Sequence, residues 1–163
     1  VTSFFTGYQF EQNAASYNAR QSLIAVGSGQ IWGKGLGKGT QSQLRFLPER
    51  QTDFIFASLA EESGLVGSLI IISLYGILFM FLLIESNRMK ENKFFLFTFS
   101  ILVYLFVQVL INIGMNMGLL PITGVTLPFV SYGGSSLLSS VILLAIIQRI
   151  LIENPNRKHL RIT

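Results

Sequence analysis

The chain lacks cysteine and is poor in histidine and in charge. It has 163 residues, of which one is a histidine, His159, and 12% are charged. Without cysteine it has no disulfide framework or thiolate metal site, and one histidine does not make a His-ligated zinc site. A soluble domain carries roughly 25% charged residues. The low charge disfavours a soluble enzyme, and no basic stripe predicts a nucleic-acid partner.

Half of the residues are hydrophobic, and they gather in three stretches with almost no charge. These stretches predict spanning helices at 65–84, 94–118 and 136–152. Backbone groups in lipid must bond within the chain, and about 20 helical residues at ~1.5 Å each cross a ~30 Å hydrocarbon core. The predicted fold class is an all-α, polytopic membrane bundle.

The charges between the stretches predict which side of the membrane each loop faces. Basic residues lie in the short loop 85–93 and in the tail 153–163, whereas 119–135 has no charge. The positive-inside rule makes the loop and tail cytoplasmic, and 119–135 and the large region 1–64 external. Region 1–64 also holds five basic residues, so the reverse orientation is the alternative. Charge in long loops has little topological weight.

Region 1–64 contains a glycine-dense run over 27–39, which is typical of tight turns and of close backbone approach. A flexible loop without a ligand is the alternative. Basic side chains follow one another through and after this run: Lys34, Lys38, Arg45 and Arg50. Cations beside glycine-rich backbone suit a diphosphate group. Contacts with anionic lipid headgroups are the alternative.

Asp53 is the most pointed candidate for chemistry. Apolar residues follow it, and desolvation makes a carboxylate a better base. A simple helix cap is the alternative. Glu61 lies eight residues later, so helical spacing places both acids near one face. Paired acids can do acid/base work or hold a divalent cation, Mg²⁺ or Mn²⁺; an interfacial acid is the alternative for Glu61.

Polar residues in the last two stretches are candidates for substrate binding. Gln108, Asn112 and Asn116 form one stripe at intervals of four, which must face protein or water. Hydrogen bonds between helices are the alternative, at ~1 kcal/mol each. Segment 119–135 is rich in proline and glycine and is predicted to be a re-entrant segment, in which Ser131 and Ser135 supply hydroxyls. A plain hydrophobic turn is the alternative.

Short motifs run through the chain in a fixed order: YN at 17–18, QS at 21–22, IAVGSG at 24–29, FLPE at 46–49, TDFIFA at 52–57, AEE-x-G at 60–64, NIGM at 112–115, GLLP at 118–121 and GVTLPFVSYGGSS at 124–136. Together they resemble the SEDS family, which includes RodA, FtsW and SpoVE. The GTQSQL run at 39–44 resembles the RodA branch more than the FtsW branch.

The resemblance implies a peptidoglycan glycosyltransferase with ten spanning helices in the bacterial cytoplasmic membrane. Such an enzyme polymerises lipid II, a polyprenyl diphosphate-linked precursor, with a class B penicillin-binding protein as partner. The family's catalytic aspartate falls on Asp53. The chain would be the C-terminal half, inactive alone, and its start at Val1 agrees with a missing front.

A non-enzymatic function remains the competing hypothesis: a transporter of lipid-linked precursor, or a membrane scaffold of the cell wall machinery. A transporter needs a polar pathway across the bilayer, and the three stretches offer only the stripe that starts at Gln108. A base at the external surface favours the transferase. The sequence leaves open whether cell elongation or division is served.

Overall fold

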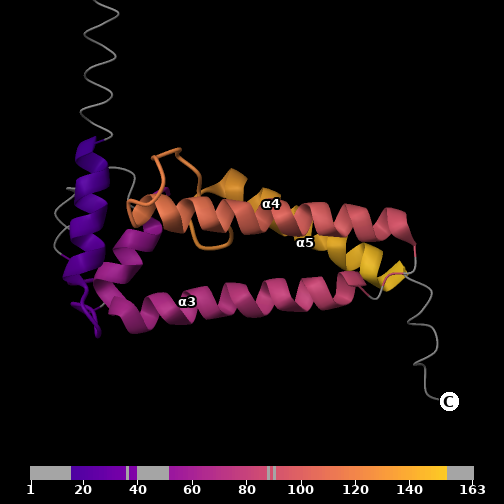
Figure 1. Cartoon of the computed structure of the whole chain (residues 1–163), viewed down its shortest axis with the longest axis horizontal. Helices are drawn as coiled ribbons and strands as arrows, with labels where there is room; N and C mark the ends of the chain where they lie inside the picture. Colours follow the sequence, from indigo (N-terminus) through magenta and orange to yellow (C-terminus); the bar gives the residue numbers. More distant parts are fainter. Residues whose placement is uncertain (1–15, 36, 40–51, 88, 90, 154–163) are drawn as a thin grey trace, which may run out of the picture.

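Three long helices make up most of the described chain. The computed structural model describes residues 16–35, 37–39, 52–87, 89 and 91–153. The long helices are α3 (Ile55–Asn87), α4 (Asn92–Asn116) and α5 (Gly134–Glu153). They extend along the longest axis of the molecule, and a shorter helix over 16–28 lies across one end of them (Figure 1). The all-helical fold class is therefore confirmed for the described residues.

All three long helices are long and apolar enough to cross a membrane, and most of their apolar side chains are exposed. The three predicted spans are thus confirmed, and the chain is an integral membrane protein. Apart from the start of α3, the helix ends differ from the predicted bounds by one to three residues. In particular, α4 ends at Asn116 and not at Gly118. Gly118 has a φ of 69°, and the next two amides bond back to the carbonyl of Gly114. A glycine in this left-handed conformation ends a helix.

Helix α3 is interrupted at Gly64, where φ is 69° and ψ is −163°. This region of backbone conformation is essentially restricted to glycine. The interruption separates a short helical segment over 55–63 from the apolar segment over 65–87. The apolar segment alone is about 35 Å long, enough for a bilayer. The start predicted at Leu65 thus coincides with the interruption, after which the helix changes direction.

The glycine-dense run packs into this interruption. Across the gap, the amides of Leu65 and Val66 donate to the carbonyls of Gln30 and Ile31, at 2.9 and 3.2 Å. A β-carbon on Gly64 would collide with the backbone of Gly33. The close backbone approach predicted for the run is therefore made to α3 itself.

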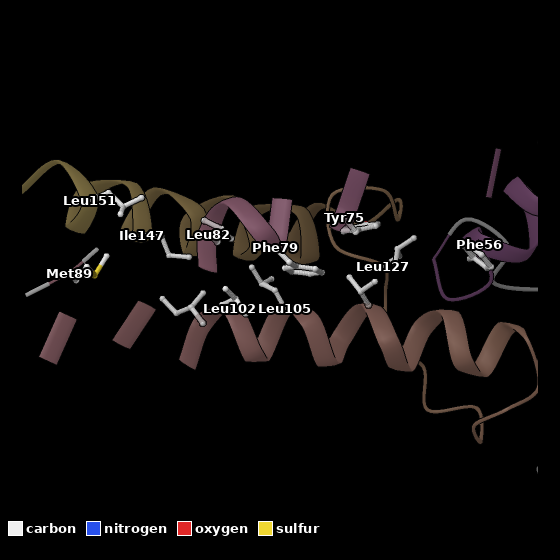
Figure 2. Packing of buried hydrophobic residues seen from close by; sticks show 12 residues of the cluster. Phe56, Tyr75, Phe79, Leu82, Met89, Leu102, Leu105, Leu127, Ile147 and Leu151 are labelled. Atoms are coloured by element: carbon white, nitrogen blue, oxygen red, sulfur yellow. The ribbon is translucent and has the colours of Figure 1, made fainter. Parts of the chain in front are cut away.

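A buried apolar cluster joins the three long helices (Figure 2). Leu105 of α4 and Ile147 of α5 are 1% exposed, and so is Leu127 from the irregular segment after α4. Phe79 of α3 stacks edge-on against Phe106 of α4, with ring centroids 5.4 Å apart. The irregular segment thus contributes Leu127 to the core, while its first residues, 117–121, are exposed.

We predict that Gly64→Ala destabilises the protein. Alanine in this backbone conformation is strained, which costs ~1–3 kcal/mol of folding free energy. Its β-carbon would also collide with the backbone of Gly33. The melting temperature of the full-length protein in detergent should fall by several degrees. Gly76→Ala, in the same helix, is the matched control, because a β-carbon there meets nothing within 4 Å. That variant should melt no lower than the wild type, and equal melting of both variants would contradict the prediction.

Candidate active site

Asp53 lies in a turn over 52–54 that leads directly into α3. Phe54 anchors the turn: it is 2% exposed and packs with Ala25 and Ala57. Asp53 itself is half-buried. Phe54, one of the apolar residues that follow Asp53 in the sequence, therefore anchors the turn that carries the carboxylate.

Two buried carboxamides hold the backbone of this turn. Nδ2 of Asn112 and Nδ2 of Asn116 each donate to the carbonyl oxygen of Asp53, both at 3.0 Å. Oδ1 of Asn116 accepts the amide of Ala57 at 3.3 Å. Both asparagine side chains are fully buried. We call these two residues the amide clamp; it joins the start of α3 to the end of α4.

The irregular segment after α4 closes the other side of the turn. Oγ of Ser131 donates to the carbonyl of Thr52 at 2.6 Å and accepts the amide of Leu127 at 2.7 Å. A β-carbon built on Gly124 would lie 3.5 Å from Oδ2 of Asp53. Gly124 therefore brings this segment close to the carboxylate of Asp53.

The same segment runs back alongside α4 from the end of the helix. Asn112 donates to the carbonyl of Val125 at 2.7 Å, and Gln108, one turn earlier, donates to that of Thr126 at 3.2 Å. Gln108 lies about 12 Å along the helix from its end. Tyr75 of α3 donates to the carbonyl of Pro128. The polar stripe thus makes the hydrogen bonds between elements that its spacing offered as one interpretation, and substrate binding by Gln108 and Asn112 stays a prediction.

Glu61 forms an ion pair with Lys34. Nζ of Lys34 lies 2.8 Å from Oε1 of Glu61, whose side chain is fully buried while that of Lys34 is 29% exposed. The amide of Lys34 also donates to the carbonyl of Glu61. The acid predicted to work beside Asp53 therefore has a cation from the glycine-dense run as its neighbour.

The described residues contain no group of three or more histidine, cysteine, aspartate or glutamate side chains that could hold a metal ion. The divalent cation stays a prediction. Of the other predicted site residues, Lys38 is exposed and Ser135 is exposed in the first turn of α5. Arg45 and Arg50 lie outside the described residues.

Asn116 was predicted as a member of the polar stripe but not as a residue of the site. Gly124, near the carboxylate of Asp53, was not predicted at all. Gly124 lies in the GVTLPF motif, but nothing in that motif indicates that it faces Asp53.

The fold and the site define a class of protein: a helical membrane protein with a carboxylate held in a fixed turn where two of its spans meet. Comparison with known families is more specific. The family described as "Cell cycle protein", which comprises FtsW, RodA and SpoVE, matches residues 1–156. The chain belongs to this family.

Similar proteins carry related descriptions. The chain is 54% identical over 124 residues to peptidoglycan glycosyltransferase MrdB of Escherichia coli, covering 76% of this chain and 34% of that protein. It is 44% identical over 152 residues to the probable peptidoglycan glycosyltransferase FtsW of Wigglesworthia glossinidia brevipalpis, covering 91% and 39%. The chain thus spans between a third and two fifths of the length of these relatives.

A solved structure is also similar, with a TM-score of 0.69 and 30% identity over 83% of this chain and 37% of that one. It is described as showing structural coordination of polymerization and crosslinking by a peptidoglycan synthase complex. At this identity the likeness supports both the fold and the family.

We predict that Asn116→Ala lowers stability more than a typical polar-to-alanine change. It leaves the amide of Ala57 without its acceptor and removes one of two donors to Asp53, and each buried group left unpaired costs ~1–3 kcal/mol. Ser100→Ala is the control, because that hydroxyl is exposed and bonds only within its own helix, to the carbonyl of Leu96. Thermal melting of the full-length protein measures both; equal melting temperatures would show that the amide clamp contributes nothing.

We also predict that Lys34→Met is destabilising, because it leaves the charge of Glu61 buried. Loss of one partner of a fully buried pair costs ~3–5 kcal/mol. The partial exposure of Lys34 reduces the expected cost to about 2 kcal/mol. Lys38→Met, at an exposed neighbour, should be silent. Adding Glu61→Gln to Lys34→Met should restore part of the loss in a thermal melt, and a double variant no more stable than the single one would contradict the ion-pair account.

Proposed function

We propose that the full-length protein is a peptidoglycan glycosyltransferase that polymerises lipid II, with Asp53 as the general base. The observation that carries the proposal is the turn itself: an acidic residue whose backbone is fixed by two fully buried carboxamides. A helix cap needs no such support from another helix. Fixed geometry is what a base needs to reach one hydroxyl.

The chemistry follows from the position of the carboxylate. Asp53 takes the proton from a hydroxyl of the acceptor sugar, and that oxygen attacks the anomeric carbon of the donor sugar. The bond from that carbon to the polyprenyl diphosphate breaks, and the diphosphate leaves with the bonding electrons. The amide clamp donates to the backbone carbonyl of Asp53 and not to its carboxylate, so it positions the base without donating to the oxygens that take the proton.

The departing diphosphate needs positive charge. The basic residues Lys38, Arg45 and Arg50 are the candidates that we favour for this stabilisation. Lys34 is a weaker candidate, because Glu61 already compensates its charge. The described side chains do not offer three acidic or histidine ligands to a metal, and the mechanism proposed here routes no step through one.

The proposal places the site at the outer face of the bacterial cytoplasmic membrane. Segment 119–135, which closes one side of the turn at Asp53, carries no charge, as expected of the external side. Region 1–64 lies on the same side, because the basic residues of a long loop have little topological weight. The segment that runs back along α4 would then be re-entrant. We propose a class B penicillin-binding protein as the partner and cell elongation as the process. The description of the similar structure as a peptidoglycan synthase complex supports the first. The resemblance of the 39–44 run to the RodA branch supports the second.

Replacing Asp53 tests the proposal. Asp53→Asn keeps the shape of the side chain and removes the base, and a general base contributes ~10²–10⁴-fold. We expect polymer formation from purified lipid II, by full-length protein with its partner, to fall by at least 100-fold. Asp53→Glu should retain partial activity.

Glu62→Gln is the matched control, since Glu62 is a half-buried acid of α3 outside the proposed mechanism. It should polymerise at the rate of the wild type. Equal melting temperature and equal partner binding of all variants would exclude misfolding. If Asp53→Asn polymerises normally, Asp53 is not the general base. If the wild type with its partner forms no polymer, the transporter or scaffold hypothesis replaces the transferase.

A further inference from the structure

Two cavities lie along α4, on the side of the helix that carries Tyr104. The one nearer to Asp53 has a volume of about 520 Å³; its walls come from Val103 to Ile111 of α4 and from 124–126 of the irregular segment. The other has a volume of about 490 Å³ and lies between α4 and α5. It is lined by residues between Phe97 and Tyr104 of α4 and between Ser139 and Leu143 of α5. Tyr104 lines both cavities, so the two are neighbours along the helix.

The lining residues of α4 form one continuous stripe. Five of them run along its middle: Phe97, Ile101, Tyr104, Gln108 and Ile111, with Ser100, Val103 and Val107 beside them. Intervals of three and four residues place them on the same side of the helix. From first to last they extend over about 21 Å of helix. We call this stripe, with the two cavities that it lines, the α4 track.

The two ends of the α4 track differ in polarity. At one end lies Gly124, where a built β-carbon would come within 3.5 Å of the carboxylate of Asp53. Gln108 and Thr126, which are hydrogen-bonded to each other, line the same end. Beyond Tyr104 the walls are apolar except for two serine hydroxyls. Both hydroxyls bond to carbonyls of their own helices. The track is thus polar beside the candidate base and apolar away from it.

We propose that the α4 track binds the polyprenyl chain of a lipid-linked substrate and places its diphosphate-sugar end at Asp53. The inference rests on the proposed function and names a binding site for it. A long apolar chain with a polar end matches a long apolar track that ends at a carboxylate. Among the described residues Tyr104 is 58% exposed, and it lies on a helix that is apolar enough to span the bilayer. The α4 track therefore runs along a segment at the depth of the membrane that a polyprenyl chain occupies.

The track would act on the reaction through position and not through affinity. Membrane lipid is as apolar as the walls of the track, so a chain gains little by leaving the bilayer for it. Holding the chain along α4 instead restricts where the diphosphate and the first sugar can lie. Correct placement of reacting groups can change rates by about 100-fold.

Filling the track tests the proposal. In the full-length protein with its partner, Val107→Trp should block the chain, because Val107 lines the cavity nearer to Asp53. Ile77→Trp on α3 is the matched control: Ile77 is also exposed, and it lines neither cavity. Two substrates are compared, lipid II with its long polyprenyl chain and an analogue with a short, water-soluble chain.

We expect Val107→Trp to lower kcat/KM for the long-chain substrate by at least tenfold, equivalent to ~1.4 kcal/mol, and for the short-chain analogue by less than twofold. Ile77→Trp should change neither. A Val107→Trp variant that uses the long chain as well as the wild type would overturn the proposal, and so would equal losses for both substrates.

Photo-crosslinking gives a second readout that does not require polymerisation. A benzophenone amino acid at position 107 should form an adduct with tagged lipid II, and one at position 77 should not. Adducts only to phospholipid, or only to another helix of the same protein, would overturn the proposal. Adding Asp53→Asn separates the two hypotheses. If polymer persists in the Asp53→Asn variant, the role proposed for Asp53 as the base is wrong. If no adduct forms at position 107, the track proposal is wrong, whatever the polymer yield.

Discussion

The candidate site depends on the hydrogen bonds from the amide clamp to the carbonyl of Asp53. The clamp residues are 59 and 63 positions away from Asp53 in the chain, and every other feature of the site is arranged around their contact. Asn112 also holds Val125 of the irregular segment, and the backbone carbonyl of Asn116 accepts a hydrogen bond from Ser22 of the helix over 16–28. Through their side chains and one backbone carbonyl, these two residues of α4 therefore contact three other parts of the chain. In a low-dielectric surrounding, such a network is stable only when each member is satisfied.

The interruption at Gly64 makes this contact compatible with a membrane span. A straight helix over all 33 residues of α3 would be about 50 Å long, far more than a bilayer requires. Because the helix changes direction at Gly64, the segment that follows Asp53 can lie at the end of the bundle while the rest crosses the bilayer. The glycine-dense run and the pair of Lys34 with Glu61 hold the short segment from its other side.

Much of the fold could be predicted from the sequence, because charge and apolar length alone decide where a helix crosses lipid. The interruption at Gly64 could not be predicted, since Gly76 in the same helix has no comparable role. Asp53 was found through its motif and its apolar neighbours. The bonding partners of the site could not be found, because hydrogen-bond targets such as the carbonyl of Asp53 leave no periodic signal. For the same reason Lys34 was assigned to a diphosphate, although its carboxylate partner lies 27 positions later.

An experimental structure of the full-length protein with its partner and a non-hydrolysable lipid II analogue would measure the distance that matters. If Asp53 is the base, one oxygen of its carboxylate lies about 2.6–3.2 Å from the attacking hydroxyl of the acceptor sugar. The amide clamp remains on the carbonyl of Asp53 in that complex. An acceptor hydroxyl that instead contacts another acidic or basic side chain, with Asp53 far from the sugar, would contradict the account.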